Sequence, residues 1–199
     1  MNFNYKYKIK KLVAGVDEVG RGSLVGPVYA AAVILNENIN KKKLKDSKKL
    51  TKQNREVLDK YIKQNSIWSI GSASTKEIEK LNILNASLLA MKRAIKKLKY
   101  KPKLVLIDGN KIPKLENYNL KNIVKGDQKV PEISAASIIA KVSRDRLVSK
   151  MSKQFVKYSW DKNSGYGTKN HISAIKKFGV TKHHRKKFQP VYNILSLKD

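Results

Sequence analysis

The sequence contains no cysteine among its 199 residues. This absence excludes a disulfide framework and any metal site built from thiolates. Long hydrophobic runs are missing as well. The longest, residues 25–35, is too short to cross a bilayer and contains Gly26 and Pro27. The basic N-terminus lacks the continuous apolar stretch of a signal peptide. We therefore expect a cytoplasmic protein that does not enter a membrane.

Acidic residues are also scarce. The chain has 15 of them against 44 basic residues, a formal net charge of +29. Such a balance favours a polyanionic partner, and nucleic acid is the usual one. Compositional drift is the alternative explanation, because 38 of the basic residues are lysines that solvated surfaces tolerate without any function.

The pattern of apolar runs and turn residues predicts a mixed α/β fold. We predict strands at residues 12–16, 27–35, 66–74, 103–110 and 122–125, the first two forming a hairpin. We predict helices at residues 51–64, 85–98, 131–154 and 168–178, and a further helix start at the capping box of Ser74. No repeat or linker divides the chain, so we expect a single domain, residues 1–199, with a basic helical appendage from about residue 155.

The segment "GRGSLVG" at residues 20–26 resembles a phosphate-binding loop only superficially. A dinucleotide-binding loop opens a helix at its glycines, whereas Pro27 and a predicted strand follow here. The P-loop pattern GxxxxGK[ST] is also absent from the sequence. Neither type of nucleotide-cofactor loop is therefore expected.

Carboxylates stand at the ends of two predicted strands. Asp17 and Glu18 end the first strand, Asp108 ends "LVLID", and Asp127 lies in "KGD" before the long helix. Taken singly, each is explained by a turn, a cap or a lysine partner. Taken together, converging carboxylates repel one another unless a cation neutralises them, and an all-oxygen site suits Mg²⁺ or Mn²⁺. Two such ions can drive phosphodiester hydrolysis.

The remaining candidates give weaker signals. His183 and His184 are adjacent, which makes a chelating pair on one helix face improbable, and His171 is expected to be a surface or packing residue. The tyrosine- and lysine-rich tail could stack on bases and bind phosphates, or it could be a solvated basic face with core aromatics.

Five segments together resemble the ribonuclease HII family, the type 2 ribonucleases H of bacteria. They are "GVDEVGRGSLVGPV", "LKDSKKLT", "LIDGN", "VKGDQKVPEISAASIIAKVSRDR" and "SGYGTKNH". They occur in the family's order and extend over most of the chain. The resemblance implies a ribonuclease H-like fold, a mixed five-stranded sheet flanked by helices with a helical C-terminal appendage.

The resemblance also implies an activity. The enzyme would hydrolyse RNA paired to DNA, including single ribonucleotides embedded in duplex DNA, with two Mn²⁺ or Mg²⁺ ions. It would cut on the 5′ side of a ribonucleotide and leave 3′-hydroxyl and 5′-phosphate ends. The implied catalytic and metal-binding residues are Asp17, Glu18, Asp108 and Asp127.

Substrate contacts follow from the same resemblance. The backbone of the Gly-Arg-Gly segment would contact the ribose 2′-hydroxyl, which distinguishes RNA from DNA. Tyr166 would stack beside the scissile ribonucleotide, and three cations would face phosphates. The implied substrate-binding residues are Gly20, Arg21, Gly22, Lys48, Lys141, Arg144 and Tyr166. One departure is visible, because Ser23 stands where the family usually has proline.

Two rival functions remain open at this level. A non-catalytic RNA-binding or ribosome-associated protein explains the charge, but it does not explain carboxylates at two strand ends. A related nuclease that cuts only long hybrids is the second rival, and the Gly-Arg-Gly segment with Tyr166 argues against it. No heptad pattern indicates an oligomer, so we expect a monomer.

Overall fold

The structure is a computed structural model that describes residues 12–44 and 51–197. Its centre is a five-stranded mixed sheet in the order β3-β2-β1-β4-β5. The strands are β1 (Val13–Val19), β2 (Val28–Leu35), β3 (Ser66–Ala73), β4 (Leu104–Asp108) and β5 (Leu120–Ile123). The first three strands pair antiparallel, and β4 and β5 join them in parallel with β1. This confirms the predicted hairpin and the predicted fold class.

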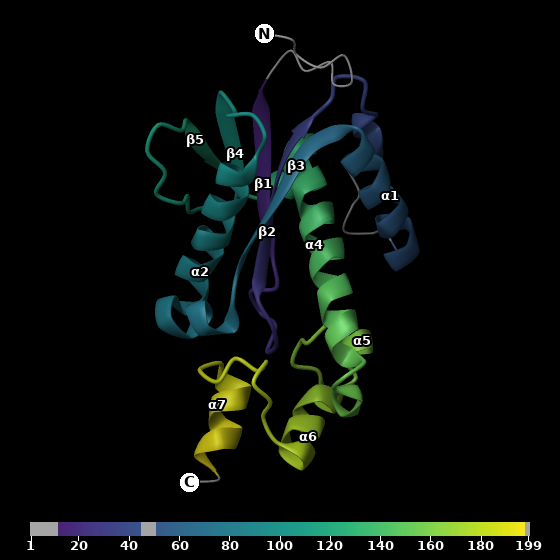
Figure 1. Cartoon of the computed structure of the whole chain (residues 1–199), viewed down its shortest axis with the longest axis vertical. Coiled ribbons are helices and arrows are strands. Elements are labelled where there is room, and N and C mark those ends of the chain that lie inside the picture. Colours follow the sequence, from purple (N-terminus) through teal and green to yellow (C-terminus); the bar gives the residue numbers. More distant parts are fainter. Residues whose placement is uncertain (1–11, 45–50, 198–199) are drawn as a thin grey trace.

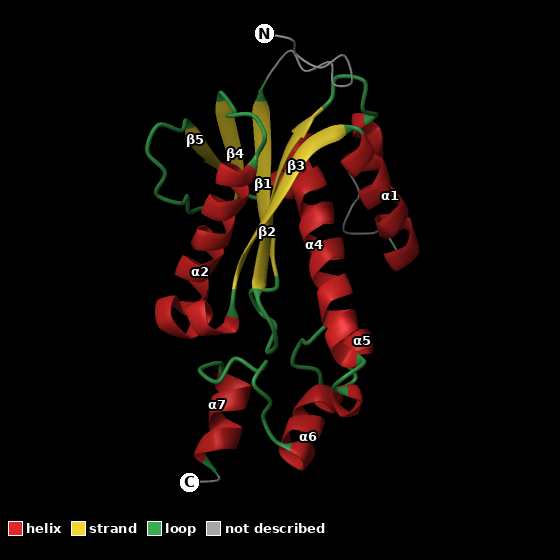
Figure 2. Ribbon diagram, viewed as in Figure 1, coloured by secondary structure: helices red, strands yellow, loops and turns green. Residues whose placement is uncertain are grey.

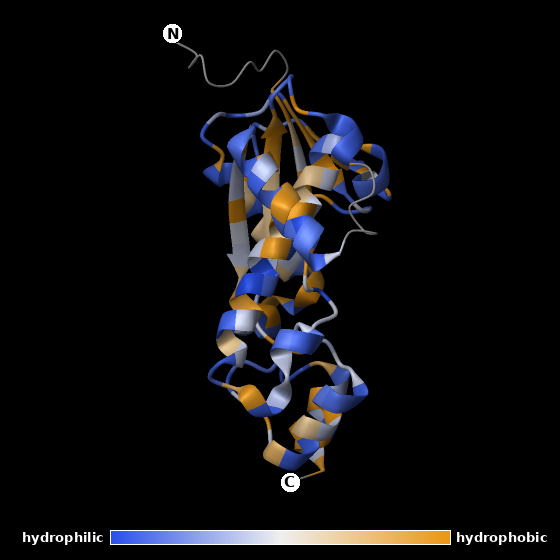
Figure 3. Ribbon diagram, turned by 90° about the vertical axis from the view of Figure 1, so that its right-hand side faces the viewer, coloured by the Kyte–Doolittle hydropathy of each residue, from blue (hydrophilic) through white to orange (hydrophobic). Residues whose placement is uncertain are grey.

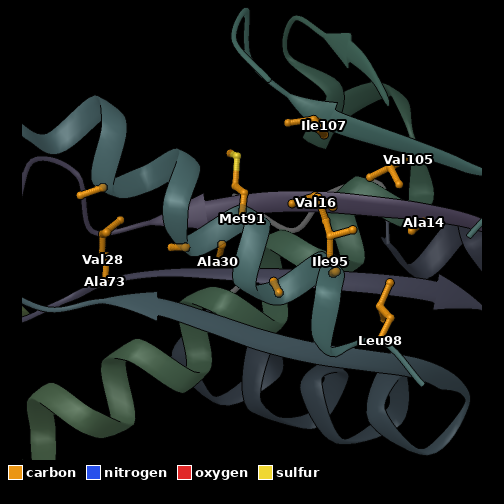
Figure 4. Packing of buried hydrophobic residues seen from close by; sticks show 14 of the residues in the cluster. Ala14, Val16, Val28, Ala30, Ala73, Met91, Ile95, Leu98, Val105 and Ile107 are labelled. Carbon is orange, nitrogen blue, oxygen red and sulfur yellow. The ribbon is translucent and has the colours of Figure 1, made fainter. Parts of the chain in front are cut away.

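Helices cover both faces of the sheet (Figures 1 and 2). The longer ones are α1 (Lys52–Gln64), α2 (Thr75–Lys97) and α4 (Pro131–Ser152). Helix α2 packs on one face, where Met91 and Ile95 meet Val16 and Ile107 (Figure 4). Helices α4 and α1 pack on the other face in a second apolar cluster. Both faces of β1 are therefore buried, which explains its nearly continuous apolar sequence.

Capping residues in the sequence predict the starts of three helices correctly. Thr51 and Thr168 accept hydrogen bonds from backbone N–H groups of the first turn, and Ser74 forms the predicted capping box with Glu77. The predicted helix start after Ser74 is confirmed, and the predicted helix at residues 85–98 corresponds to the part of α2 that follows a kink at Asn82 (φ 64°). The Asn82 side chain accepts a hydrogen bond from the backbone N–H of Asn85 (3.1 Å), as an N-cap residue does at a helix start.

The C-terminal part extends the molecule along its long axis, beyond the sheet (Figures 1 and 3). It contains α5 (Trp160–Asn163), α6 (Lys169–Phe178) and α7 (Gln189–Ser196), of which α5 and α7 were not predicted. The short helical segments are η1 (Lys41–Leu44), η3 (Val156–Tyr158) and α3 (Gly126–Lys129). No helix in the described ranges is long and apolar enough to cross a membrane.

Buried Trp160 organises the packing of this C-terminal part. Its indole N–H donates to Nε2 of His171 (2.9 Å), and Nδ1 of His171 lies 2.9 Å from the carbonyl oxygen of Tyr166. Nε2 of buried His184 is 3.3 Å from Nε2 of His171. His171 is thus a packing residue, one of the two roles expected for it, and its carbonyl partner belongs to Tyr166.

Candidate active site

Strand β1 carries two of the predicted carboxylates within its last residues. Asp17 and Glu18 lie opposite Ala31 and Ala30 of β2. Gly15, two residues earlier, allows α4 to approach closely, since a Cβ there would be 2.0 Å from the backbone of Glu132. This close approach places Asp17 against α4. As a result, the Asp17 side chain is buried, with 6 % of the residue exposed.

Strand β4 brings Asp108 to the same end of the sheet. Val16 of β1 pairs with Ile107 of β4 in parallel, so Asp17 and Asp108 occupy the next positions of neighbouring strands. The backbone N–H of Gly126 donates to Oδ1 of Asp108 (2.6 Å). Because Asp127 follows Gly126 directly, this hydrogen bond ties the start of α3, and with it buried Asp127, to the end of β4.

The carboxyl groups of Asp17, Glu18 and Asp108, here called the carboxylate cluster, lie close enough together for the charge of Asp108 to act on both Asp17 and Glu18. Burial raises the pKa of Asp17 well above its usual value, and the charges of Glu18 and Asp108 add to the effect. Burial also raises the pKa of Glu18, while its ion pair with Arg21 (3.2 Å) and the charge of Asp108 act in opposite directions. Negative charge is therefore held here at an energetic cost that a cation would offset.

The chemistry of these donors fits a hard divalent cation, because every candidate ligand is a carboxylate oxygen. The Ser137 hydroxyl and the N–H of Glu18 bond to Asp17 and orient it. Within the part of the chain that the structure describes, no three acidic or histidine side chains are spaced as a preformed metal cluster. The cluster thus has suitable donors and suitable charge, without a closed coordination shell.

The Gly-Arg-Gly segment follows β1 and faces Tyr166. Gly20 has φ +91° and lies against the side chain of Arg144, where a Cβ would come within 2.2 Å of Nε. Arg21 and Gly22 are exposed, and a Cβ on Gly22 would meet only the Tyr166 ring, at 3.9 Å. Ser23 forms an isolated bridge with Tyr166. The structure therefore brings together the two segments that the sequence suggested for sugar recognition.

The predicted phosphate-facing cations differ in position. Lys141 forms an ion pair with Asp145 (2.9 Å) and lies 5.7 Å from the centre of the Tyr166 ring, next to the Gly-Arg-Gly segment. Arg144 was expected to face a phosphate, but it is fully buried and its guanidinium donates to backbone carbonyls, so that expectation is wrong. Lys48 lies outside the described residues.

Sequence reasoning missed Arg185. Its side chain is fully buried and donates to the carbonyl oxygens of Arg21 and Gly26, both at 2.9 Å. It therefore touches the Gly-Arg-Gly segment from 164 residues away. One signal could have drawn attention to it: an arginine is unusual in a chain that otherwise uses lysine for positive charge.

Comparisons with known proteins agree with this geometry. A sequence model of the family Ribonuclease HII matches residues 14–191. A protein named Ribonuclease HII from Pelagibacter ubique is 72 % identical over 185 residues, which are 93 % of this chain and 100 % of that protein. The similarity to the family therefore extends over nearly the whole chain.

Solved structures give the same fold. The ribonuclease H2 from Pyrococcus horikoshii superposes with a TM-score of 0.79 at 26 % identity, over 93 % of this chain and 97 % of that one. Bst-RNase HIII in complex with Mn²⁺ superposes with a TM-score of 0.73 at 16 % identity, over 97 % of this chain and 71 % of that one. The second likeness bears on the fold alone.

Proposed function

Because this chain belongs to the ribonuclease HII family and is a metal-dependent ribonuclease acting on RNA–DNA hybrids, we propose that it also nicks duplex DNA at single embedded ribonucleotides. Cleavage would occur on the 5′ side of the ribonucleotide, leaving a 3′-hydroxyl and a 5′-phosphate. The proposed ligands of two Mg²⁺ or Mn²⁺ ions are Asp17, Glu18, Asp108 and Asp127.

The carboxylate cluster is the observation that carries this proposal. Three carboxyl groups converge at the ends of two neighbouring strands in a chain of net charge +29. A binding protein for nucleic acid has no use for negative charge that opposes its ligand. A hydrolase that holds cations against a phosphodiester requires it.

The roles of the side chains follow from their partners. The four carboxylates would hold the two ions, which would supply activation of a water for attack on phosphorus and stabilisation of the departing 3′-oxygen. Asp17 is held by Ser137 and by the N–H of Glu18, and Asp108 is held by the N–H of Gly126. These bonds fix the carboxylate oxygens before any cation arrives, which reduces the reorganisation that binding requires.

The neighbouring surface supplies recognition of the sugar. Exposed Gly22 lets the backbone approach a ribose closely, and the Tyr166 ring beside it offers a stacking face. Lys141 lies next to that ring and would face a phosphate. Lys48, beyond the described residues, stays a prediction, and so do the monomeric state, the cytoplasmic location and the division into one domain with an appendage.

A nicking assay on three end-labelled duplexes tests the proposal. The first carries one ribonucleotide in DNA, the second is a long RNA–DNA hybrid, and the third is the same sequence in DNA only. We expect metal-dependent cleavage of the first two, with a single cut 5′ to the lone ribonucleotide, and none of the third. Cleavage of the long hybrid alone would favour the rival in which only long hybrids are substrates.

A further inference from the structure

Two buried guanidinium groups lie behind the Gly-Arg-Gly segment. Arg144 and Arg185, here called the arginine pair, are both fully buried. Neither forms an ion pair with a carboxylate of the described residues. Burial, together with the charge of Arg144, lowers the pKa of Arg185 to about 9. Burying a charge without an ion-pair partner costs folding free energy. The hydrogen-bond partners of Arg144 and Arg185 therefore indicate the role of the two side chains.

Arg185 binds carbonyl oxygens of the loop between β1 and β2. Its Nε donates to the carbonyl of Gly26 and its Nη1 to the carbonyl of Arg21, each at 2.9 Å. The guanidinium carbon also lies over the Phe188 ring, 5.0 Å from the ring centre. One planar side chain therefore joins the two ends of residues 21–26.

Arg144 binds the same loop from α4. Its guanidinium donates to the carbonyls of Val25 (3.0 Å), Pro27 (3.4 Å) and Ser164 (3.1 Å). The Ser164 bond connects the loop to the segment that carries Tyr166. Arg144 thus accounts for the attachment of the loop to the core, and Arg185 is the member of the pair that holds the Gly-Arg-Gly segment itself.

The bond from Arg185 to Arg21 determines where the next N–H points. In a trans peptide the C=O and the following N–H point in opposite directions, and the described chain has no cis peptide. The carbonyl of Arg21 points inward to Arg185, so the N–H of Gly22 points away from it, on an exposed residue. No described residue accepts a hydrogen bond from this N–H.

We propose that Arg185 is a positioning residue for ribose recognition, which orients the Gly22 N–H as a free donor for the 2′-hydroxyl of the substrate. The proposal rests on the function proposed above. A 2′-hydroxyl oxygen accepts such a bond, and a deoxyribose offers no acceptor there. Arg185 therefore contributes to the distinction between RNA and DNA without touching either.

Arginine suits this role better than lysine. Its planar fork has donors in fixed directions and can hold two carbonyls at once, whereas an ammonium group offers no such rigid geometry. Arg185→Lys keeps the charge but should lose one of the two carbonyl bonds. Arg185→Met removes the charge and both bonds while keeping much of the side-chain volume.

Binding of two duplexes in EDTA, which prevents cleavage, tests the role. The duplexes are identical except that one contains a single ribonucleotide, and the measured quantity is the ratio of the all-DNA Kd to the ribonucleotide-duplex Kd. For wild-type protein we expect a ratio well above one. Arg185→Met should lower it by about fivefold, the usual effect of one lost hydrogen bond. Arg185→Lys should lie between the two, and the all-DNA Kd should stay unchanged.

Arg93→Met is the matched control. Arg93 is a partly buried arginine that donates to the Ser72 carbonyl and pairs with Glu77, far along the chain from the loop. Its removal should change stability without changing the ratio. If circular dichroism shows that Arg185→Met does not fold, the ratio measured for Arg185→Lys tests the role instead.

Three results would overturn the inference. The first is a wild-type ratio in both Arg185 variants, and the second is an equal loss of affinity for both duplexes, which a purely structural role predicts. The third is a ratio of one for the wild-type protein, which would already contradict ribose recognition in the proposed function before any variant is made. The failures of the two proposals are therefore distinguishable.

Discussion

The carboxylate cluster and the arginine pair are two groups of like charges within one small enzyme, the first partly buried and the second fully buried. Asp17, Glu18 and Asp108 gather negative charge at the ends of β1 and β4. Arg144 and Arg185 gather positive charge behind the loop that follows β1. In neither place does an ion pair among the described residues neutralise the whole charge. The two sites differ in the groups that compensate this charge.

The difference lies in which groups satisfy the charge. The guanidinium groups of the arginine pair donate to backbone carbonyls of the chain itself, so these contacts form on folding, although Nη2 of Arg185 has no hydrogen-bond partner among the described residues. The carboxylate cluster receives only a few donors, and burial raises the pKa values of Asp17 and Glu18. The arginine pair should therefore govern stability and loop geometry, whereas the carboxylate cluster should respond to an external cation.

The largest expected effect comes from breaking the carboxylate cluster. Asp17→Asn should slow cleavage of an RNA–DNA hybrid by more than about a hundredfold, beyond the loss seen when groups that merely orient metal ligands are removed. Binding of the hybrid should be retained. Initial rates under excess Mn²⁺ measure the first effect, and fluorescence anisotropy measures the second.

The thermal stability of the same variant gives an independent readout. Because the raised pKa means that folding disfavours the charged Asp17, removing the charge should raise the Tm of the metal-free protein at pH 7. The gain in Tm that Mn²⁺ gives to wild-type protein should shrink. Asp161→Asn makes the same chemical change at an exposed residue of α5 and should alter neither rate nor Tm. A hybrid-cleaving Asp17→Asn variant would remove Asp17 from the site.

The next effect comes from disturbing the arginine pair through its glycine neighbour. Gly20→Ala should lower the free energy of unfolding by about 2–4 kcal/mol, because the new Cβ meets Nε of Arg144 at 2.2 Å and φ is +91°. Gly22→Ala is the matched comparison. Its Cβ meets only the Tyr166 ring at 3.9 Å, so we expect less than about 1 kcal/mol. Urea unfolding measures both, and equal losses would contradict the close contact with Arg144.

The two sites were not equally visible in the sequence. Asp17 and Asp108 were predictable because apolar strands end at them and parallel strands bring their ends together. Arg144 was misassigned because spacing on a helix gives the face of a residue but not the elements that cover it. Covering Arg144 requires Ser164 and Val25, which the sequence separates widely. Arg185 could not be placed for the same reason.

The predicted elements show the same limit. Capping residues such as Ser74 and Thr168 act locally, and the helices they begin were predicted at the right residues. The short helix α7, by contrast, follows a segment that contacts α2, where the backbone N–H of Lys186 donates to Oε1 of Glu79. Local propensity does not encode such contacts.

Acid should add charge next to the arginine pair. Burial, with the charges of His171 and His183, lowers the pKa of His184 from 6.5 to about 4. Since the folded state resists protonating His184, its contribution to stability is complete above pH 6.5 and is lost as the pH falls towards 4. The free energy of unfolding should fall by roughly 3 kcal/mol over that window.

A substitution isolates this effect. The backbone N–H of Thr181 donates to Nδ1 of His184 (2.9 Å), and an asparagine oxygen can take that place. His184→Asn should therefore flatten the dependence of the unfolding free energy on pH between 4 and 6.5, measured by urea titration at each pH. His183→Asn, at a less buried ring, should flatten it less. An unchanged slope in His184→Asn would show that His184 is not the group that titrates.

The smallest effect is expected at Ser23, where the chain departs from its family. The Ser23 hydroxyl lies within hydrogen-bond distance of the carbonyls of Gly165 (2.9 Å) and Val25 (3.1 Å), and the Ser23 N–H makes a long bond to the carbonyl of Gly20 (3.4 Å). Ser23→Pro removes both, but the arginine pair still holds four carbonyls of residues 21–27. The cleavage rate at a single ribonucleotide should thus change by less than about tenfold. Ser23→Ala, which removes only the hydroxyl, separates the loss of the hydroxyl from the loss of the N–H. A larger change in Ser23→Pro would mean that Ser23, and not the arginine pair, fixes the loop against Tyr166.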